Sequence, residues 1–444
     1  MNCLQERYKL SQYNVFYQDG DVQYVWNTYS DALLKLDKNG QEYIRSFAGT
    51  DDKSYEFDLL KTNDFIVYEQ IDEFGRICLQ EKQVLFTNNP GGLTFLIVPG
   101  MACNFSCSYC FQATAEKSGI MTPETAEKVA EYICCQLECN QNIKQLRITW
   151  FGGEPLLYVN IIEIISHKII EYTRRNEIKY SASIISNGRF LDAKTLSLLK
   201  DCYVETAQIT IDGTRDLYCK SKGASSEDFD SVINNIKNAV GAIKMAIRLN
   251  IPNNDANEAI ALTDYLLIQC NLLSKVPVYF AYVCDYSTSA DVSQQKYINY
   301  VQNYFKWLDY MIEHFDKSDF KTKVQNIKSR PTTCNIIRLH NSCIGPHGEL
   351  YKCEHCLGNK PKIIGNVWQG RFFNEAEMVY YKTVDDPTKN KCSKCEYLPI
   401  CMSDCANDWV NGFSKFNCEA HKQLLLRLKL LECDVFNFRT NLII

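Results

Sequence analysis

Three cysteines, Cys103, Cys107 and Cys110, follow a short apolar segment with the spacing CxxxCxxC. A closed structural zinc site needs four ligands, and only three thiols are local here. Three thiolates on one loop instead suit a four-iron cluster that keeps one iron open to a further ligand. The next apolar segment ends in GGEP at 152–155, and paired glycines there let backbone groups approach a ligand closely. The two motifs together predict a cofactor site.

A second group of cysteines lies in the C-terminal part of the chain. Of 22 cysteines, nine lie between Cys334 and Cys418, and four of these form the pattern CxxCxxxxxCxxxC at 392–405. A large chain without a secretion signal keeps its thiols reduced, so clustered spacing predicts metal ligation. CxxC pairs bind zinc as well as iron, so this segment alone leaves the metal open.

Composition narrows the class of protein. The chain has 444 residues, 46% of them hydrophobic, and a net charge of −5. Nucleic-acid binding usually needs an excess of basic residues, so we expect no nucleic-acid partner. The start, MNCLQERYKL, lacks an apolar signal region, and no uncharged apolar run is long enough to cross a bilayer. We therefore expect a cytoplasmic protein with no membrane partner.

The cysteine loop and GGEP belong to an alternating pattern of elements. Continuous apolar strands alternate with amphipathic helices, which is typical of a parallel sheet covered by helices. We predict an α/β fold, a partial (β/α)6 barrel with functional residues at the carboxyl ends of its strands. The predicted strands are 94–99, 146–151, 181–186, 206–211, 245–251 and 278–283.

Changes in pattern suggest five parts: 1–88, the barrel 93–290, a bridging helix 291–330, a cysteine-rich part 331–421 and a final helix 422–444. The sequence NNPGG at 88–92 is a linker signal. Within the first part, 22–37 predicts a strand, a turn and a short helix, and 57–69 predicts a helix leading into a strand.

With these motifs in order, the chain resembles the radical S-adenosylmethionine (SAM) enzymes. The resemblance implies that Cys103, Cys107 and Cys110 are catalytic and hold a [4Fe-4S] cluster whose open iron binds SAM. It places Tyr109 near adenine, Arg248 on the SAM carboxylate, and five further residues around the rest of SAM. Gly152, Gly153 and Glu154 would receive the amino group, and Ser186 and Thr210 would lie near the sugar and methionine. One departure is LYCKSK at 217–222, where the family commonly has a histidine and an arginine.

The second cysteine group resembles the SPASM extension, which holds two auxiliary [4Fe-4S] clusters and brings the expected total to three. The nearer cluster has three matching ligands, and its fourth is Cys343, Cys356 or a substrate thiolate. Glu354 stands where sulfatase-maturing members usually have aspartate. His347, His355 and His421 are further candidate ligands, although isolated histidines are more often surface or hydrogen-bonded residues. The carried-over ligands are Cys392, Cys395, Cys401 and Cys418 for the distal cluster, and Cys334, Cys353 and Cys405 for the nearer one.

The first part, 1–88, resembles the winged-helix element that binds leader peptides, in which an extended peptide adds to a sheet edge; a cap without a partner is the alternative. The resemblance implies a peptide maturase similar to thioether-forming (sactipeptide or ranthipeptide type) synthases. A 5′-deoxyadenosyl radical from SAM would take a hydrogen from a precursor-peptide carbon, and the auxiliary clusters would accept an electron or bind a substrate cysteine. A leader-bearing peptide and an electron donor of flavodoxin or ferredoxin type are the expected partners. Carbon–carbon crosslinking, formylglycine formation in a sulfatase, an inactive peptide-binding escort and a zinc-ribbon protein are the alternatives.

Overall fold

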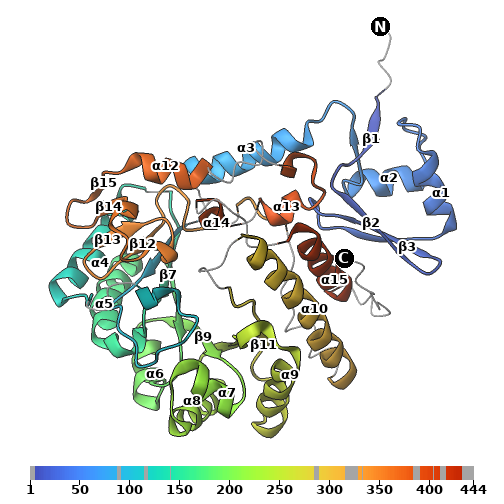
Figure 1. The fold of residues 1–444 in the computed structure, drawn as a ribbon. Coiled ribbons are helices and arrows are strands. Elements are labelled where there is room, and N and C mark those ends of the chain that lie inside the picture. Colours follow the sequence, from blue (N-terminus) through green and yellow to red (C-terminus); the bar gives the residue numbers. More distant parts are fainter. Residues whose placement is uncertain are drawn as a thin grey trace.

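The protein is described by a computed structural model, in which a partial barrel and a smaller N-terminal unit are joined by long helices (Figure 1). None of the helices in its described part is long and apolar enough to cross a membrane. The described residues are 6–87, 92–114, 119–140, 142–284, 290–315, 329–332, 334–383, 391–403, 405–410 and 417–432.

Six parallel strands form the barrel wall, as the sequence predicts. Each strand pairs with the next along the chain, so their carboxyl ends lie at one edge. In register, Ile97 faces Trp150 and Trp150 faces Ile184. The loops that follow therefore start side by side. The strands are β6 (Leu93–Ile97), β7 (Gln145–Trp150), β8 (Lys179–Ser186), β9 (Val204–Ile211), β10 (Lys244–Leu249) and β11 (Val278–Phe280).

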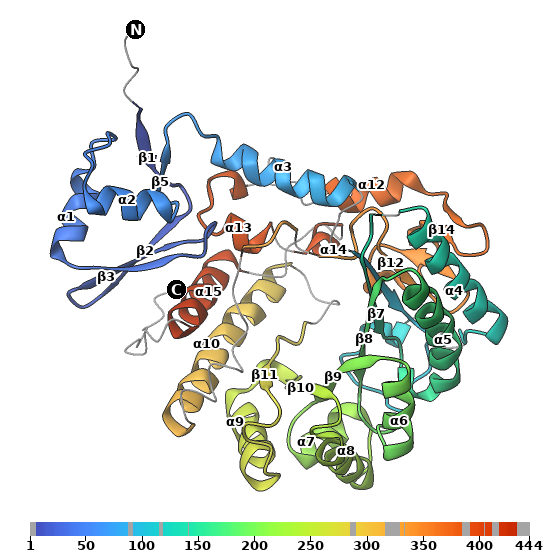
Figure 2. The ribbon, with the colours of Figure 1, turned by 180° about the vertical axis from the view of Figure 1, so that it is seen from behind.

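Amphipathic helices cover the outer face of this wall (Figure 2). In the first of them the Thr122 hydroxyl accepts a hydrogen bond from the Thr125 amide, with Pro123 in the first turn. Such a cap stabilises a helix by about 1 kcal/mol. The buried face carries Val129 and Ile133, as its periodicity predicts. The helices are α4 (Pro123–Glu138), α5 (Val159–Arg175), α6 (Ala193–Asp201), α7 (Arg215–Lys222), α8 (Ser226–Ala239) and α9 (Ala256–Asp264).

The sheet continues beyond β6 into the cysteine-rich part. Strand β12 (Ser342–Ile344) lies parallel to β6, and three short antiparallel strands follow it, giving a ten-stranded sheet among the described residues. This extension was not predicted from the sequence, and it places Cys343 and Cys353 beside the barrel. The three strands are β13 (Glu349–Tyr351), β14 (Gly365–Asn366) and β15 (Arg371–Phe372).

The N-terminal unit contains two small sheets and three helices. The predicted helix and strand within 57–69 are confirmed as α2 (Tyr55–Thr62) and β5 (Ile66–Tyr68), with β5 pairing with β1 (Tyr8–Leu10). The prediction of a short helix within 22–37 is wrong. Its leucines form β4 (Leu33–Leu36), which pairs with β3 (Val22–Asn27) as the third strand beyond β2 (Asn14–Asp19). The helix α1 (Lys38–Ser46) begins only after Asp37, whose side chain caps it; α3 (Glu73–Phe86) follows β5.

Long-range contacts dock this unit on the cysteine-rich part and on the final helix. The Thr28 hydroxyl donates to the Glu396 carbonyl at 2.5 Å, and Lys429 pairs with Asp31 at 2.7 Å. Helix α15, which carries Lys429, packs beside the bridging helix α10 (Figure 1). The remaining helices are α10 (Ala290–His314), α12 (Glu375–Thr383), α13 (Leu398–Cys401), α14 (Ala406–Val410) and α15 (Cys418–Glu432). The linker at 88–92 lies mostly outside the described residues, and the proposed domain limits stay predictions.

Candidate functional site

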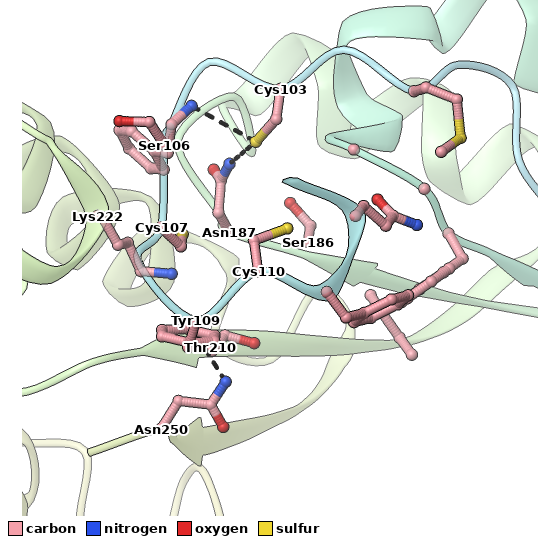
Figure 3. A pocket seen from close by; sticks show the side chains of 18 residues that line it. Cys103, Ser106, Cys107, Tyr109, Cys110, Ser186, Asn187, Thr210, Lys222 and Asn250 are labelled. Carbon is pink, nitrogen blue, oxygen red and sulfur yellow. Dashed lines mark hydrogen bonds between the residues drawn. The ribbon is translucent and has the colours of Figure 1, made fainter. Parts of the chain in front are cut away.

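A cavity of about 270 Å³ opens at the carboxyl ends of the barrel strands. Figure 3 shows the cysteine loop over it, with side chains from successive strand ends pointing in. The parallel register explains this convergence, because each loop leaves the sheet at the same edge. Eight of the predicted residues line the cavity: Cys103, Cys107, Tyr109, Cys110, Gly152, Gly153, Ser186 and Thr210.

The two glycines after β7 are required by close backbone packing. Gly152 has φ +125°, a conformation that other residues rarely adopt, and a Cβ there would lie 2.6 Å from the Gly100 oxygen. A Cβ on Gly153 would lie 2.2 Å from the Ala102 oxygen. The Glu154 amide donates to that same oxygen at 3.0 Å. The glycines therefore let the segment leading to Cys103 pack directly on the end of β7.

Glu154 binds neighbouring protein groups. Its carboxylate accepts hydrogen bonds from the Ser186 hydroxyl and the Asn187 amide, both at 2.8 Å, and from the Leu156 amide at 2.9 Å. The side chain is buried, and burial raises the pKa of Glu154 despite these donors. Glu154 thus ties the end of β7 to the end of β8, and its predicted contact with the SAM amino group stays a prediction.

Arg248 approaches the cavity only indirectly. Its Nε donates to Asn250 Oδ1 at 2.8 Å, and Asn250, which lines the cavity, donates from Nδ2 to the Tyr109 hydroxyl at 3.4 Å. Asn250, two residues after Arg248 at the same strand end, was not predicted as a site residue. The predicted contact between Arg248 and the SAM carboxylate stays a prediction.

Lys222 is a further cavity residue without a role predicted from the sequence. Its side chain is 3% exposed, its ammonium lies 3.1 Å from the Asp212 carboxylate, and it lines the cavity beside Cys107 (Figure 3). Burial acts to lower the pKa of Lys222, but the attractions of Asp212, Cys107 and Tyr218 together outweigh it, so the pKa lies above its ordinary value. The only sequence signal was the departure LYCKSK, which ends in this lysine.

The lining fits an iron–sulfur cluster and SAM. Burial raises the pKa of the Cys107 thiol to about 11, so a metal ion binding there would displace a proton. Gln112 Nε2 is buried in the lining and has no hydrogen-bond partner among the described residues, as expected of a donor that awaits a ligand. Within the described ranges no three acidic, histidine or cysteine side chains already form a metal site, so the ligand assignment stays a prediction.

Cysteines predicted for the nearer auxiliary cluster meet in one buried region. Cys343, Cys353 and Cys356 share a core cluster with Ala406, and Cys334 packs against it. Cys356 Sγ lies 2.8 Å from the Tyr381 hydroxyl. Its hydrogen bond with Cys353 lowers the pKa of Cys356, whereas burial raises that of Cys343 well above its ordinary value.

The distal set lies on the segment that meets the N-terminal unit. Cys395 donates its amide to the Cys392 carbonyl at 3.0 Å, and Cys401 ends α13. Cys418 begins α15 and is near enough to act on the pKa of Cys395. Cys405 directly precedes α14. The assignment of Cys392, Cys395, Cys401 and Cys418 to a distal cluster stays a prediction.

An aromatic contact joins the cavity to the nearer cysteine region. Phe111, which lines the cavity, stacks on Phe151 at 6.3 Å and contacts His355 at 4.2 Å between ring centroids. His355 stands in the turn between Cys353 and Cys356. The other two candidate histidines have the ordinary surroundings of surface and hydrogen-bonded residues. His347 is exposed, and the ring of His421 lies 2.6 Å from the Tyr297 hydroxyl.

His421 gives a pH-dependent stability. Burial lowers its pKa from 6.5 to about 4, so the unfolded chain binds the proton more tightly. The stabilisation from neutral His421 is complete above pH 6.5 and is lost as pH falls toward 4. We expect thermal unfolding to show a smaller loss of Tm over this interval in His421→Gln than in the wild type. Parallel curves for the two proteins would contradict this assignment.

The class of protein follows from this arrangement. A family model described as "Radical SAM superfamily" matches residues 97–266, the stretch from β6 to the end of α9 that carries the cysteine loop and the glycine pair. Residues 97–266 therefore form a radical SAM domain.

Two relatives and one solved protein are similar to it. The chain is 32% identical over 158 residues to the radical SAM cyclopropyl synthase TigE of Paramaledivibacter caminithermalis, covering 32% of this chain and 30% of TigE. It is 31% identical over 115 residues to the uncharacterized protein MJ0907 of Methanocaldococcus jannaschii, a match that covers 25% of this chain and 35% of MJ0907. The matches thus span about a third of each relative. In structure the chain is similar to anSMEcpe with bound AdoMet, at 17% identity and a TM-score of 0.55, covering 77% of this chain and 100% of that one; this likeness concerns the fold.

Proposed function

We propose that this chain is a radical SAM peptide maturase that takes a hydrogen from a carbon of a precursor peptide and forms a crosslink, with a cysteine thioether as the favoured product. The cofactors would be SAM and three [4Fe-4S] clusters, and an external flavodoxin-type or ferredoxin-type donor would supply electrons. The observation that carries the proposal is the three-cysteine cavity at the strand ends, with a second buried cysteine region beside it.

The residues present would hold these groups in separate places. Cys103, Cys107 and Cys110 would bind the first cluster, and SAM with that cluster would supply the carbon-centred radical that begins the reaction. The barrel wall would orient SAM through its hydroxyl and amide groups, including Ser186 and Asn250. Phe111 and Phe151 would exclude water on the side that faces the second cysteine region.

Thioether formation also needs an electron acceptor. The substrate would lose a hydrogen atom from carbon and a proton from sulfur, and one electron must leave when the carbon–sulfur bond forms. Cys334, Cys353, Cys356 and Cys405 would hold a cluster able to take it, next to the cavity through His355.

A peptide substrate is supported by the N-terminal unit. Its three-stranded sheet ends in the edge strands β2 and β4, and an edge strand suits addition of an extended leader. The unit also docks on the distal cysteine segment through Thr28. The protein anSMEcpe, which shares the fold, has been solved with a Cp18Cys peptide as well as AdoMet.

A carbon–carbon bond is the second candidate. It is supported by the match to TigE, whose name describes a cyclopropyl synthase, because a three-carbon ring requires a new carbon–carbon bond. Both products lose hydrogen from the peptide, so the fate of the cysteine distinguishes them.

The test uses reconstituted full-length protein, SAM, dithionite and a synthetic peptide encoded by a short cysteine-containing reading frame next to the gene. We expect a product lighter by two hydrogens with one cysteine that iodoacetamide no longer alkylates. The same mass loss with every cysteine alkylated would favour the carbon–carbon product. Unchanged peptide together with 5′-deoxyadenosine release would contradict this substrate, and the absence of both would contradict the proposal.

A further inference from the structure

A buried ion pair lies at the wall of the SAM cavity. Lys222 and Asp212 have side chains that are 3% and 0% exposed, and their charged atoms are 3.1 Å apart. Lys222 lines the cavity, whereas Asp212 is not among its lining residues. Among the described residues that line this cavity, Lys222 is the one with a charged side chain. The cavity thus presents a single fixed positive charge.

Backbone hydrogen bonds fix the lysine relative to the cysteine loop. The Ser106 amide donates to the Lys222 carbonyl at 2.9 Å, and the Ser108 amide donates to the Ser221 carbonyl at 3.0 Å. The loop between Cys103 and Cys110 is therefore bound to the last two residues of α7. A change in the position of Lys222 relative to Cys107 would have to break these bonds.

The side chain is equally constrained. The ammonium lies 6.0 Å from the ring centroid of Phe105 and 5.5 Å from that of Tyr218. Asp212 is in turn held by the Ser221 hydroxyl, which donates to it at 3.1 Å. Burying two charges costs several kcal/mol per ion, and replacing such a pair by apolar residues is often neutral or stabilising. A pair retained at this cavity wall therefore calls for a role other than stability.

The group that the cavity would hold is anionic. A four-iron cluster with three thiolate ligands carries net negative charge, and its one-electron reduction adds another. A nearby positive charge in a water-poor site stabilises the reduced form more than the oxidised form. Lys222 lines the cavity together with the three cysteines and Asp212 does not, so the positive end of the pair is the one that faces the thiolates.

We propose that Lys222 tunes the cluster of Cys103, Cys107 and Cys110, raising its reduction potential by holding a fixed positive charge beside the Cys107 thiolate. The proposal rests on the cluster part of the proposed function and is independent of the peptide and of the bond formed. The lysine acts on electron entry, in which one electron passes from a reductant such as dithionite to the cluster and no bond is made or broken.

The experiment is an anaerobic redox titration with dithionite, followed by electron paramagnetic resonance in the absence of SAM. The signal that is missing from the variant with all three loop cysteines replaced by alanine identifies this cluster. In Lys222→Met we expect the reduction equilibrium to shift by at least about tenfold toward the oxidised form, which is about 59 mV for a one-electron couple. Lys222→Arg keeps the charge and should stay within about threefold of the wild type.

A double variant distinguishes an effect of Lys222 on the reduction potential of the cluster from mere neutralisation of Asp212. Lys222→Met alone leaves Asp212 buried without its partner, whereas Asp212→Asn with Lys222→Met removes both charges. If Lys222 tunes the cluster, the double variant should fold and load iron like the wild type yet keep a lowered potential. If Lys222 only neutralises Asp212, the double variant returns to the wild-type potential and the proposal is wrong.

Two further measurements keep the outcomes distinct. Iron content of the wild type tests the cluster assignment, so a wild type without iron contradicts the proposed function rather than the role of Lys222. Calorimetric titration with SAM tests the other role open to this lysine. Weaker SAM binding with an unchanged potential in Lys222→Met would overturn the proposal and assign Lys222 to the ligand.

Discussion

Replacing Cys103, Cys107 and Cys110 together by alanine should remove about one of three four-iron clusters and abolish 5′-deoxyadenosine formation with dithionite and SAM. These three thiols line one cavity with Gly152 and Gly153, and a cluster cannot be held when its thiolate ligands are absent. Iron and sulfide analysis gives the first readout, and chromatography of 5′-deoxyadenosine gives the second. The loss of activity should be complete rather than graded, because no other described cysteine lines this cavity.

A matched control uses three cysteines on the outside of the barrel. Cys135 on α4 and Cys139 directly after it are exposed, with their sulfur atoms 4.0 Å apart, and Cys134 is half-buried beside them. Their replacement by alanine should leave iron content and SAM cleavage unchanged. Undiminished cleavage in the Cys103, Cys107 and Cys110 variant, or an equal loss in the control, would show that the wrong cysteines have been assigned.

The barrel could be predicted because its signals are local. Strands of continuous apolar residues and helices with a periodic apolar face each occupy a short stretch, and the Thr122 cap is visible in sequence. The cavity residues followed from the same pattern, since motifs directly after consecutive parallel strands must meet at one edge. Eight predicted residues therefore line the cavity together.

What the sequence analysis missed depends on contacts between distant segments. Strand β12 pairs with β6 about 250 residues earlier in the chain, and nothing in its three residues indicates that partner. The sequence predicts a short helix at the end of 22–37, but Leu33–Leu36 is the strand β4, which is fixed by its pairing with β3. Lys222 could not be predicted as a site residue because composition and spacing do not show that its side chain is buried at the cavity wall.

The last prediction concerns the fourth ligand of the nearer auxiliary cluster. We expect Cys356→Ala to lose about one four-iron cluster and Cys343→Ala to keep all three. Cys356 shares a turn with Cys353, and its sulfur lies 3.9 Å from the Asn407 side chain, two residues after Cys405. Cys343 is fully buried on β12, a strand fixed on both sides by its pairing with β6 and β13. A turn can adjust to a cluster more readily than a strand held on both edges.

The two variants are matched, since each removes one buried sulfur from the same core cluster. Tyr381→Phe provides a graded third case, because it removes only the hydroxyl 2.8 Å from Cys356 and should retain iron. Mössbauer spectroscopy of each protein counts the clusters. Loss of a cluster in Cys343→Ala but not in Cys356→Ala would reverse the assignment.

The outcome bears directly on the chemistry. If Cys356 is required, the nearer cluster has four protein ligands, and its role in the reaction is to take the electron released when the crosslink forms. If neither cysteine is required, one iron is open, and a substrate thiolate held on it would be deprotonated and close to the carbon radical, which favours a carbon–sulfur bond. A cluster with four protein ligands can accept the electron whether a carbon–sulfur or a carbon–carbon bond forms. The identity of the fourth ligand and the alkylation of the product cysteine are therefore independent tests. An open cluster together with an alkylatable cysteine in the product would contradict the thioether assignment even though the site could bind sulfur.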